Sequence, residues 1–177
     1  METVNDKNFR VEKADKYYFY QTELTKELDK VKSKFDQNDI NRIVLWKLNR
    51  FAKLNNESLI LLNKVNKNDK TINPKLTKQI LESLLITMGI QLPIASTILH
   101  FKNPNIYQII DQRVYRILYG KLYKNIKTKK PNEQIKLYLE YLHDLKNTCA
   151  ELKIPFSRGD HILYMADKRI NKKIKLL

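Results

Sequence analysis

The chain has 177 residues, of which 34 are lysine or arginine and 19 are aspartate or glutamate, so its formal net charge is +15. A surplus of this size attracts polyanions and releases counterions when phosphates bind, which favours nucleic acid as the partner over an anionic membrane surface. A residue bias that spreads lysines over solvated faces is the alternative. The single cysteine, Cys149, excludes an intramolecular disulfide and a zinc or iron–sulfur site built from four cysteines.

Hydrophobic residues make up 42% of the chain, and only 3 glycines and 5 prolines are present. This composition predicts an all-α fold with a full core and disfavours a β-sandwich. The start of the sequence lacks an apolar signal core, and no apolar run approaches the roughly 18 residues of a membrane span. We therefore expect a cytoplasmic protein with no membrane partner. No repeat or linker marks a boundary, so we expect one domain over residues 1–177, with one or two helical lobes.

The first third of the chain predicts helices. Residues 14–36 begin with the aromatic run Tyr17–Tyr20, which is typical of a core or a partner surface, and continue with apolar residues at helical spacing. A second helix is expected after a cap at Asn38 or Asp39, and a short third helix near 57–65. The apolar stripe of the second helix comprises Ile40, Val44, Leu45, Leu48, Phe51 and Ala52.

The middle of the chain predicts two helices joined by a very short turn. Asn73 caps a helix over about 75–88 with Pro74 at its first position, and Gly89 ends it in a left-handed conformation. The next helix runs over about 92–101. The side chains available for packing are Leu76, Ile80, Leu84 and Leu85 on the first helix and Ala95, Ile98, Leu99 and Phe101 on the second.

Three helices are expected in the last part of the chain. Asp111 caps a helix that runs to Gly120, and two further helices cover about 132–152 and 158–174. The apolar face of the first of these two comprises Leu137, Leu139, Tyr141, Leu142 and Leu145. In the basic stretch before them, phosphate contacts or a solvated loop are expected at Lys127, Lys129 and Lys130.

The turn at Gly89, Ile90 and Gln91 is of chemical interest. The helix that follows it begins with unpaired backbone N–H groups at Leu92, and the small Ala95 lets the two helices approach closely. Exposed amides at such a turn could hold a phosphate without reading sequence. An ordinary helical hairpin within a bundle is the alternative.

The residues that follow favour the phosphate-binding interpretation. The segment GIQLPIASTILHFKNPNIYQIIDQRVYRILYG, residues 89–120, resembles the signature of the helix-hairpin-helix DNA glycosylase superfamily (HhH-GPD, endonuclease III/MutY type). Gly89 matches the first hairpin glycine, Ala95 the family alanine and Asp111 the catalytic aspartate. The remaining matches are Ile109, Ile110, Val114, Arg116, Ile117 and Leu118. The resemblance covers about a fifth of the chain.

The resemblance implies a compact bundle of two helical lobes with a cleft, with its helix-hairpin-helix core at 75–120. It also implies removal of a damaged or modified base from double-stranded DNA by a nucleoid-associated protein. Gln91 stands where a second hairpin glycine is expected, which would alter how the turn holds a phosphate. Pro93 stands where bifunctional members keep a catalytic lysine, so we expect a monofunctional DNA glycosylase that forms no Schiff base and leaves an abasic site. No iron–sulfur cluster is expected, and a cation at the hairpin remains open.

Asp111 is the candidate catalytic residue. Its carboxylate would stabilise the positive charge that builds on the sugar, or position the attacking water, once the base has been rotated into a pocket. As a helix cap it would bond the amides of Arg113 or Val114, and both roles can coexist. A close pair with Arg113 would lower the pKa of Asp111, and for Arg116 a structural ion pair is the alternative to a phosphate contact. The residues expected at the DNA are Gly89, Ile90, Gln91, Leu92, Ala95, Arg113 and Arg116.

Further pocket residues are predicted from their places in the sequence. Trp46 could stack on a flipped base, with core packing as the alternative, and Tyr107 could lie at the pocket mouth. Asp160 or His161 could face Asp111 across the cleft, although a helix N-terminus also accounts for Asp160.

Metal and nucleotide sites receive no support from the sequence. His100 and His143 have no cysteine or acidic partner at metal-ligand spacing, so no metal is predicted. No glycine-rich phosphate loop, serine elbow or zincin histidine pair is present. Two rivals to the glycosylase stay open: a non-catalytic helix-hairpin-helix DNA-binding module, favoured by Gln91 and Pro93, and a helical protein-interaction domain whose basic charge is residue bias.

Overall fold

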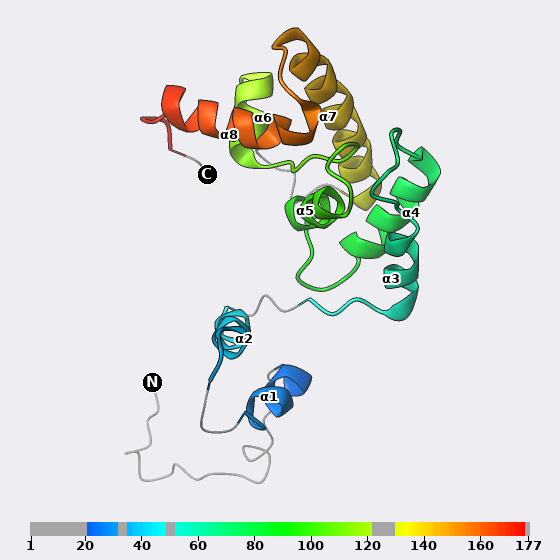
Figure 1. The fold of residues 1–177 in the computed structure, drawn as a ribbon, viewed down its shortest axis with the longest axis vertical. Coiled ribbons are helices and arrows are strands. Elements are labelled where there is room, and N and C mark those ends of the chain that lie inside the picture. The colour runs from blue at the N-terminus through cyan, green and yellow to red at the C-terminus, as the bar shows by residue number, and fades with distance from the viewer. Residues whose placement is uncertain (1–20, 32–34, 49–51, 122–129, 176–177) are drawn as a thin grey trace. The chain divides into compact units, whose positions relative to one another are not determined.

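The computed structural model describes residues 21–31, 35–48, 52–121 and 130–175 (Figure 1). Within these ranges the chain is all-helical and contains no strand, as the composition predicts. None of the described helices combines the length and apolar character that a membrane span needs. Several residues of the predictions lie outside the described residues: Tyr17–Tyr20, Phe51, Lys127 and Lys129.

The chain divides into two compact units, residues 1–51 and 52–177. The predicted core at 75–120 lies wholly within the second unit. The expectation of a single domain over the whole chain stays a prediction.

The described part of the first unit consists of α1 (Thr22–Leu28) and α2 (Gln37–Lys47). The expected cap at Asn38 or Asp39 is wrong, because Asp36 caps α2. The Asp36 carboxylate accepts from the Asp39 amide, and the Asp39 carboxylate accepts from the Asp36 amide, so the two form a capping box. In the predicted apolar stripe of α2, the exposed side chains are Ile40, Val44, Leu45 and Leu48.

Six α-helices and one 3-10 turn make up the described part of the second unit (Figure 1). They are α3 (Asn56–Asn63), α4 (Pro74–Leu85), α5 (Leu92–Lys102), α6 (Gln112–Tyr119), α7 (Pro131–Glu151), η3 (Phe156–Arg158) and α8 (Gly159–Ile170). α4 packs against α3, α5 and α7, and α8 packs against α6 and α7. The predicted cap at Asn73 with Pro74 behind it is confirmed, and so is the helix from Asp111 to Gly120.

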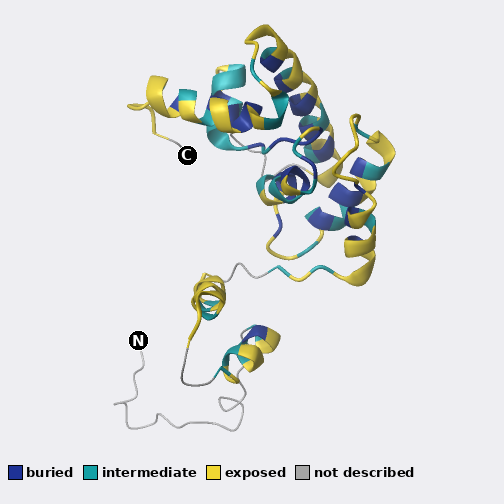
Figure 2. Cartoon of the chain, viewed as in Figure 1, coloured by how far each residue is buried: buried dark blue, intermediate teal, exposed yellow. Residues whose placement is uncertain are grey.

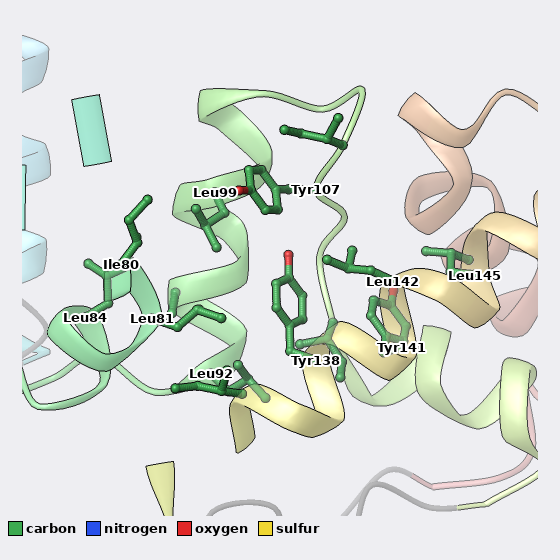
Figure 3. Packing of buried hydrophobic residues seen from close by; sticks show 14 of the residues in the cluster. Ile80, Leu81, Leu84, Leu92, Leu99, Tyr107, Tyr138, Tyr141, Leu142 and Leu145 are labelled. Carbon is green, nitrogen blue, oxygen red and sulfur yellow. The ribbon is translucent and has the colours of Figure 1, made fainter. Parts of the chain in front are cut away.

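The core of this unit forms where α4, α5 and α7 face one another (Figures 2 and 3). Ile80 and Leu84 of α4 and Leu99 of α5 are almost fully buried, as their spacing predicts, and Leu81, which was not predicted, is buried beside them. α7 adds the buried Tyr138 and Leu142 (Figure 3). Burial of Tyr141, Leu142 and Leu145 confirms these members of the predicted face, whereas Tyr138 was not predicted. The predicted face residues Leu137 and Leu139 are only half-buried, and Phe101 of α5 is exposed rather than packed.

The turn between α4 and α5 contains a left-handed glycine. α4 ends at Leu85 with Ile86 as its cap, so the expectation that Gly89 itself caps the helix is wrong. Gly89 lies within the turn, with a φ of 83°, and nothing stands within 4 Å of the place where a Cβ would be. Backbone conformation, rather than space, therefore requires glycine here.

Replacing Gly89 by Ala should lower the free energy of unfolding by about 1–2 kcal/mol, because a Cβ is strained in the left-handed region. Chemical denaturation followed by circular dichroism measures this change. The matched control is Ile86→Ala, since Ile86 is exposed in the same turn but has an ordinary helical backbone. Equal stability of Gly89→Ala and the unsubstituted chain would contradict the assigned turn.

Candidate functional site

Residues 107–110, which precede Asp111, are not helical and are held by side chains of three helices. From α5, the Ser96 hydroxyl accepts from the Ile110 amide at 3.2 Å. The Nδ1–H of His100, also on α5, donates to the Tyr107 carbonyl at 3.2 Å. The helix after the turn thus fixes the chain that leads to the aspartate.

α7 holds the same segment with two phenols. The hydroxyl of Tyr138 donates to the Gln108 carbonyl at 2.9 Å, and that of Tyr141 donates to the Ile109 carbonyl at 2.6 Å. Burial raises the pKa of both phenols well above the ordinary tyrosine value, so both remain protonated donors.

α8 supplies the last attachment through Asp160, which is 2% exposed. Its carboxylate accepts from the Ile109 amide at 2.9 Å, and its own amide donates to the Gln108 side chain at 3.3 Å. Asp160 can reach this segment because α8 begins close to α7. α8 begins at Gly159, where a Cβ would lie 2.5 Å from the Cys149 sulfur of α7. Asp160 thus bonds a neighbouring segment, in addition to standing in the first turn of its helix.

Asp111 caps α6 and also lines a pocket. Its Oδ1 accepts from the amides of Arg113 and Val114, both at 2.8 Å, as the cap interpretation predicts. Its Oδ2 accepts no hydrogen bond from the residues that the structure describes. The pocket has a volume of about 230 Å³ and is lined by Ile109, Asp111, Val114, Asp160, His161 and Tyr164. This lies just below the roughly 300–1,000 Å³ of clefts for drug-sized ligands, so a single flat ring system is a better match in size than a larger ligand.

Burial raises the pKa of Asp111 above the usual aspartate value, and the two amide bonds oppose that rise. The close pair with Arg113 that would have lowered this pKa does not form; the Arg113 charge still lowers it, but by less than burial raises it. Arg113 turns to α8 instead: its guanidinium lies 3.3 Å from Asp167 and over the ring of Tyr164, 5.6 Å from the centroid.

Arg116 forms the structural ion pair that was the alternative to a phosphate contact. It is 6% exposed and binds both carboxylate oxygens of Asp167, at 2.9 and 2.6 Å. It also donates to the Ile174 carbonyl at 3.1 Å. These bonds lower the pKa of Asp167 and join α6 to α8.

The predicted pocket residues Tyr107 and Trp46 make other contacts. Tyr107 is 1% exposed and shares a 2.7 Å hydrogen bond with Thr77, so its placement at the pocket mouth is wrong and it belongs to the core (Figure 3). Trp46 lies in the first unit, where its indole N–H donates to the Thr25 hydroxyl at 2.9 Å. That contact agrees with the packing alternative for Trp46.

The turn before α5 exposes backbone donors. The amides of Thr87 and Ile90 donate within the turn, to Leu84 and Thr87 respectively. By contrast, the amides of Gly89 and Gln91 bond to no group in the described ranges. Gln91, at the position of the expected second glycine, has a φ of −108°, a value that any residue adopts, so the turn does not require glycine there.

The sequence missed the contributions of Ser96, Tyr164 and Asp167. Asp160, Tyr164 and Asp167 follow one another at spacings of four and three residues, which places them on one face of a helix. That spacing was a usable signal for a polar face of α8 turned towards α6. The role of Ser96 left no such signal.

His100 has an acidic partner after all. Its Nδ1 lies 3.6 Å from Asp160 Oδ2, although sixty positions separate the two residues in the sequence. The sequence shows no acidic partner at metal-ligand spacing from His100, because spacing along the chain reveals partners only within one element or motif. His143 is exposed and contacts Asn147 on its own helix.

Comparison of the chain with protein-family models, with curated proteins and with solved structures finds no match.

Proposed function

We propose that the second unit removes a damaged or modified base from double-stranded DNA as a monofunctional, glycosylase-like hydrolase. The observation that carries the proposal is the placement of Asp111. One of its carboxylate oxygens holds the start of α6, while the other makes no hydrogen bond in the described ranges, and the residue lines a pocket of about 230 Å³. The attachments from α5, α7 and α8 keep this carboxylate in place without further reorganisation.

In the proposed reaction the base is rotated into the pocket and the sugar lies beside Asp111. Water attacks C1′, the bond from C1′ to the base nitrogen breaks, and its electron pair leaves with the base. The carboxylate offsets the positive charge on the sugar and accepts the proton that the water loses, while solvent protonates the departing base. The products are the free base and an abasic site.

The turn between α4 and α5 is proposed to grip the DNA backbone as a helix-hairpin-helix motif. The amides of Gly89 and Gln91, which bond to no group in the described ranges, are donors of the kind that bind phosphate without reading sequence. α5 carries both this turn and Ser96, which holds the Ile110 amide next to Asp111. A phosphate held by the turn would therefore be linked to the pocket through one short helix.

The direct test of the proposal is incubation with a panel of duplexes that each contain one modified base, followed by alkali. We expect alkali-labile abasic sites for at least one lesion. We expect no strand cleavage before alkali and no covalent adduct on borohydride treatment, because Pro93 offers no amine. Strand cleavage without alkali, together with a trapped adduct, would contradict the monofunctional mechanism.

Gln91 and Pro93 favour one alternative, a DNA-binding module of the same architecture that does not cut the base–sugar bond. Tight, salt-dependent duplex binding with no abasic sites on any lesion would favour this alternative. Absence of duplex binding at low salt would contradict both functions and favour a protein-interaction domain.

Replacing Met88 by Glu should weaken duplex binding roughly tenfold at low salt, because it places a negative charge beside the amides proposed to bind phosphate. Met88 is 88% exposed, so the fold should tolerate the change. Fluorescence anisotropy with a labelled duplex measures the affinity. The control is Leu152→Glu, an equal charge change at an exposed position just after α7. Equal weakening by both substitutions would show that only net charge matters and would reject the turn as the grip.

A further inference from the structure

His100, Asp160 and His161 come together at the wall of the Asp111 pocket. One ligand atom from each of the three lies within 4.8 Å of the others. His100 Nδ1 is 3.6 Å from Asp160 Oδ2, and His161 Nε2 is 3.9 Å from Asp160 Oδ1. The two imidazole rings are 5.2 Å apart between centroids. Asp160 and His161 both line the pocket.

Two of the three donors are already fixed by the fold. His100 is 4% exposed, and its Nδ1–H bond to the Tyr107 carbonyl sets the neutral tautomer and leaves the lone pair on Nε2. A backbone carbonyl that orients a histidine in this way is the usual outer contact of a metal ligand. Asp160 is held by the Ile109 amide, and each of its oxygens keeps a further lone pair.

The third donor is adjustable. The side chain of His161 is 52% exposed, so its ring can rotate towards Asp160 without disturbing the core. The 3.9 Å between His161 Nε2 and Asp160 Oδ1 is a little longer than the separation of two ligands that share a metal at about 2.0–2.2 Å, and rotation of the exposed His161 ring closes this gap.

We propose that His100, Asp160 and His161 bind one first-row divalent metal ion of the zinc type. Two imidazoles and one carboxylate suit zinc, and three protein ligands leave an open coordination position. Because Asp160 and His161 line the pocket, that position faces the space that Asp111 shares. The site does not depend on the glycosylase proposal, since it requires neither DNA nor Asp111.

The experiment uses the full chain with any affinity tag removed, because a histidine tag would bind the same ions. The protein is loaded with Zn²⁺ or with Co²⁺ as a spectroscopic probe, dialysed, and assayed for metal content and Co²⁺ visible absorption. We expect one ion per chain and the intense visible bands of low-coordinate Co²⁺.

The deciding variant is His161→Gln, and its matched control is His143→Gln, another exposed histidine that lies outside the cluster. His161→Gln should weaken metal binding at least tenfold, whereas His143→Gln should bind as the unsubstituted chain does. Circular dichroism confirms that both variants fold. Less than stoichiometric metal in the unsubstituted chain, or equal affinity in His161→Gln, overturns the proposal. Should His161→Gln fail to fold, the unsubstituted chain is treated with a histidine-modifying reagent with and without Zn²⁺. The proposal expects Zn²⁺ to protect His161 but not His143, and equal modification of both overturns the site.

Metal binding and base removal can fail separately. Binding is measured without DNA, and base removal is measured with Asp111→Asn as its reference. Loss of metal with base removal intact would leave the proposed function standing, and the reverse result would leave the metal site standing.

Discussion

Replacing Asp111 by Asn should lower the rate of base removal by about 10²–10³-fold, while duplex binding stays within about twofold. Asn retains the size of the side chain and its cap bonds to Arg113 and Val114, because an amide oxygen accepts from the same N–H groups. It removes the negative charge that would face the sugar. Single-turnover assays of abasic-site formation, beside anisotropy measurements of binding, separate the two effects.

The same substitution should leave the protein as stable as before or slightly more stable near neutral pH. Burial raises the pKa of Asp111, so the folded chain binds this proton more tightly than the unfolded chain. The contribution of a group with a raised pKa is present at low pH and is lost as the pH rises through the folded value. At neutral pH the ionised, partly buried carboxylate therefore costs stability, and Asn relieves that cost.

Asp36→Asn is the matched control for Asp111→Asn, because Asp36 also caps a helix by accepting from an amide but belongs to the first unit. It should leave base removal unchanged. If Asp111→Asn removed bases at the rate of the unsubstituted protein, the Asp111 carboxylate would cap α6 without a catalytic role. If Asp36→Asn were equally inactive, loss of activity would follow from cap disruption in general.

Replacing Asp167 by Asn should destabilise the fold by about 3–5 kcal/mol, the usual effect of removing one partner of a buried ion pair. Asp167 is fully buried and binds Arg116 through both oxygens, Arg113 through one and the Asn171 side chain through the other. The substitution leaves the Arg116 guanidinium, which is 6% exposed, without a counter-charge. Denaturant titration of Asp167→Asn and of the unsubstituted protein measures the difference in free energy of unfolding.

The difference in free energy of unfolding between Asp167→Asn and the unsubstituted protein should decrease at low pH. The pKa of Asp167 is lowered, chiefly by its hydrogen bond from Arg116. The stability that it contributes is present above the ordinary aspartate pKa of about 3.9 and is lost as the pH falls through the lowered folded value. The gap between Asp167→Asn and the unsubstituted chain should be constant near neutrality and shrink below about pH 4.

The control for Asp167→Asn is Glu82→Gln. Glu82 faces Lys78 across an exposed 3.7 Å pair, which should contribute less than about 1 kcal/mol. A loss of stability in Asp167→Asn no larger than that of Glu82→Gln would show that the α6–α8 ion pair does not hold the unit together.

Local signals predicted the local structure well. Asn73 and Asp111 are short polar residues placed just before apolar-periodic segments, and both cap the helices expected from them. Gly120 ends α6 in the left-handed conformation that a terminal glycine favours. The predicted cap of α2 was wrong where two acids could each serve. Asp36 caps the helix because the Asp39 side chain bonds back to the Asp36 amide.

The contacts that assemble the site could not be read along the chain. The bond from Tyr141 to Ile109 and the pairing of Arg116 with Asp167 join segments that are distant in sequence. Periodicity reports which face of a helix is buried but not which neighbour covers it. For the same reason Tyr107, next to the predicted site in sequence, points into the core and bonds Thr77 instead.

The hydrogen bonds that hold residues 107–110 determine how this part of the protein would unfold. Their carbonyls and amides are bound by side chains of α5, α7 and α8, and α8 also carries the counter-charge of Arg116. Local unfolding of α8 would remove the buried carboxylates of Asp160 and Asp167 at the same time. Residues 107–110, next to Asp111, would then lose one of their attachments. Local unfolding of α8 would therefore disrupt residues 107–110 and the Arg116 ion pair together, so the two should be lost in one cooperative step.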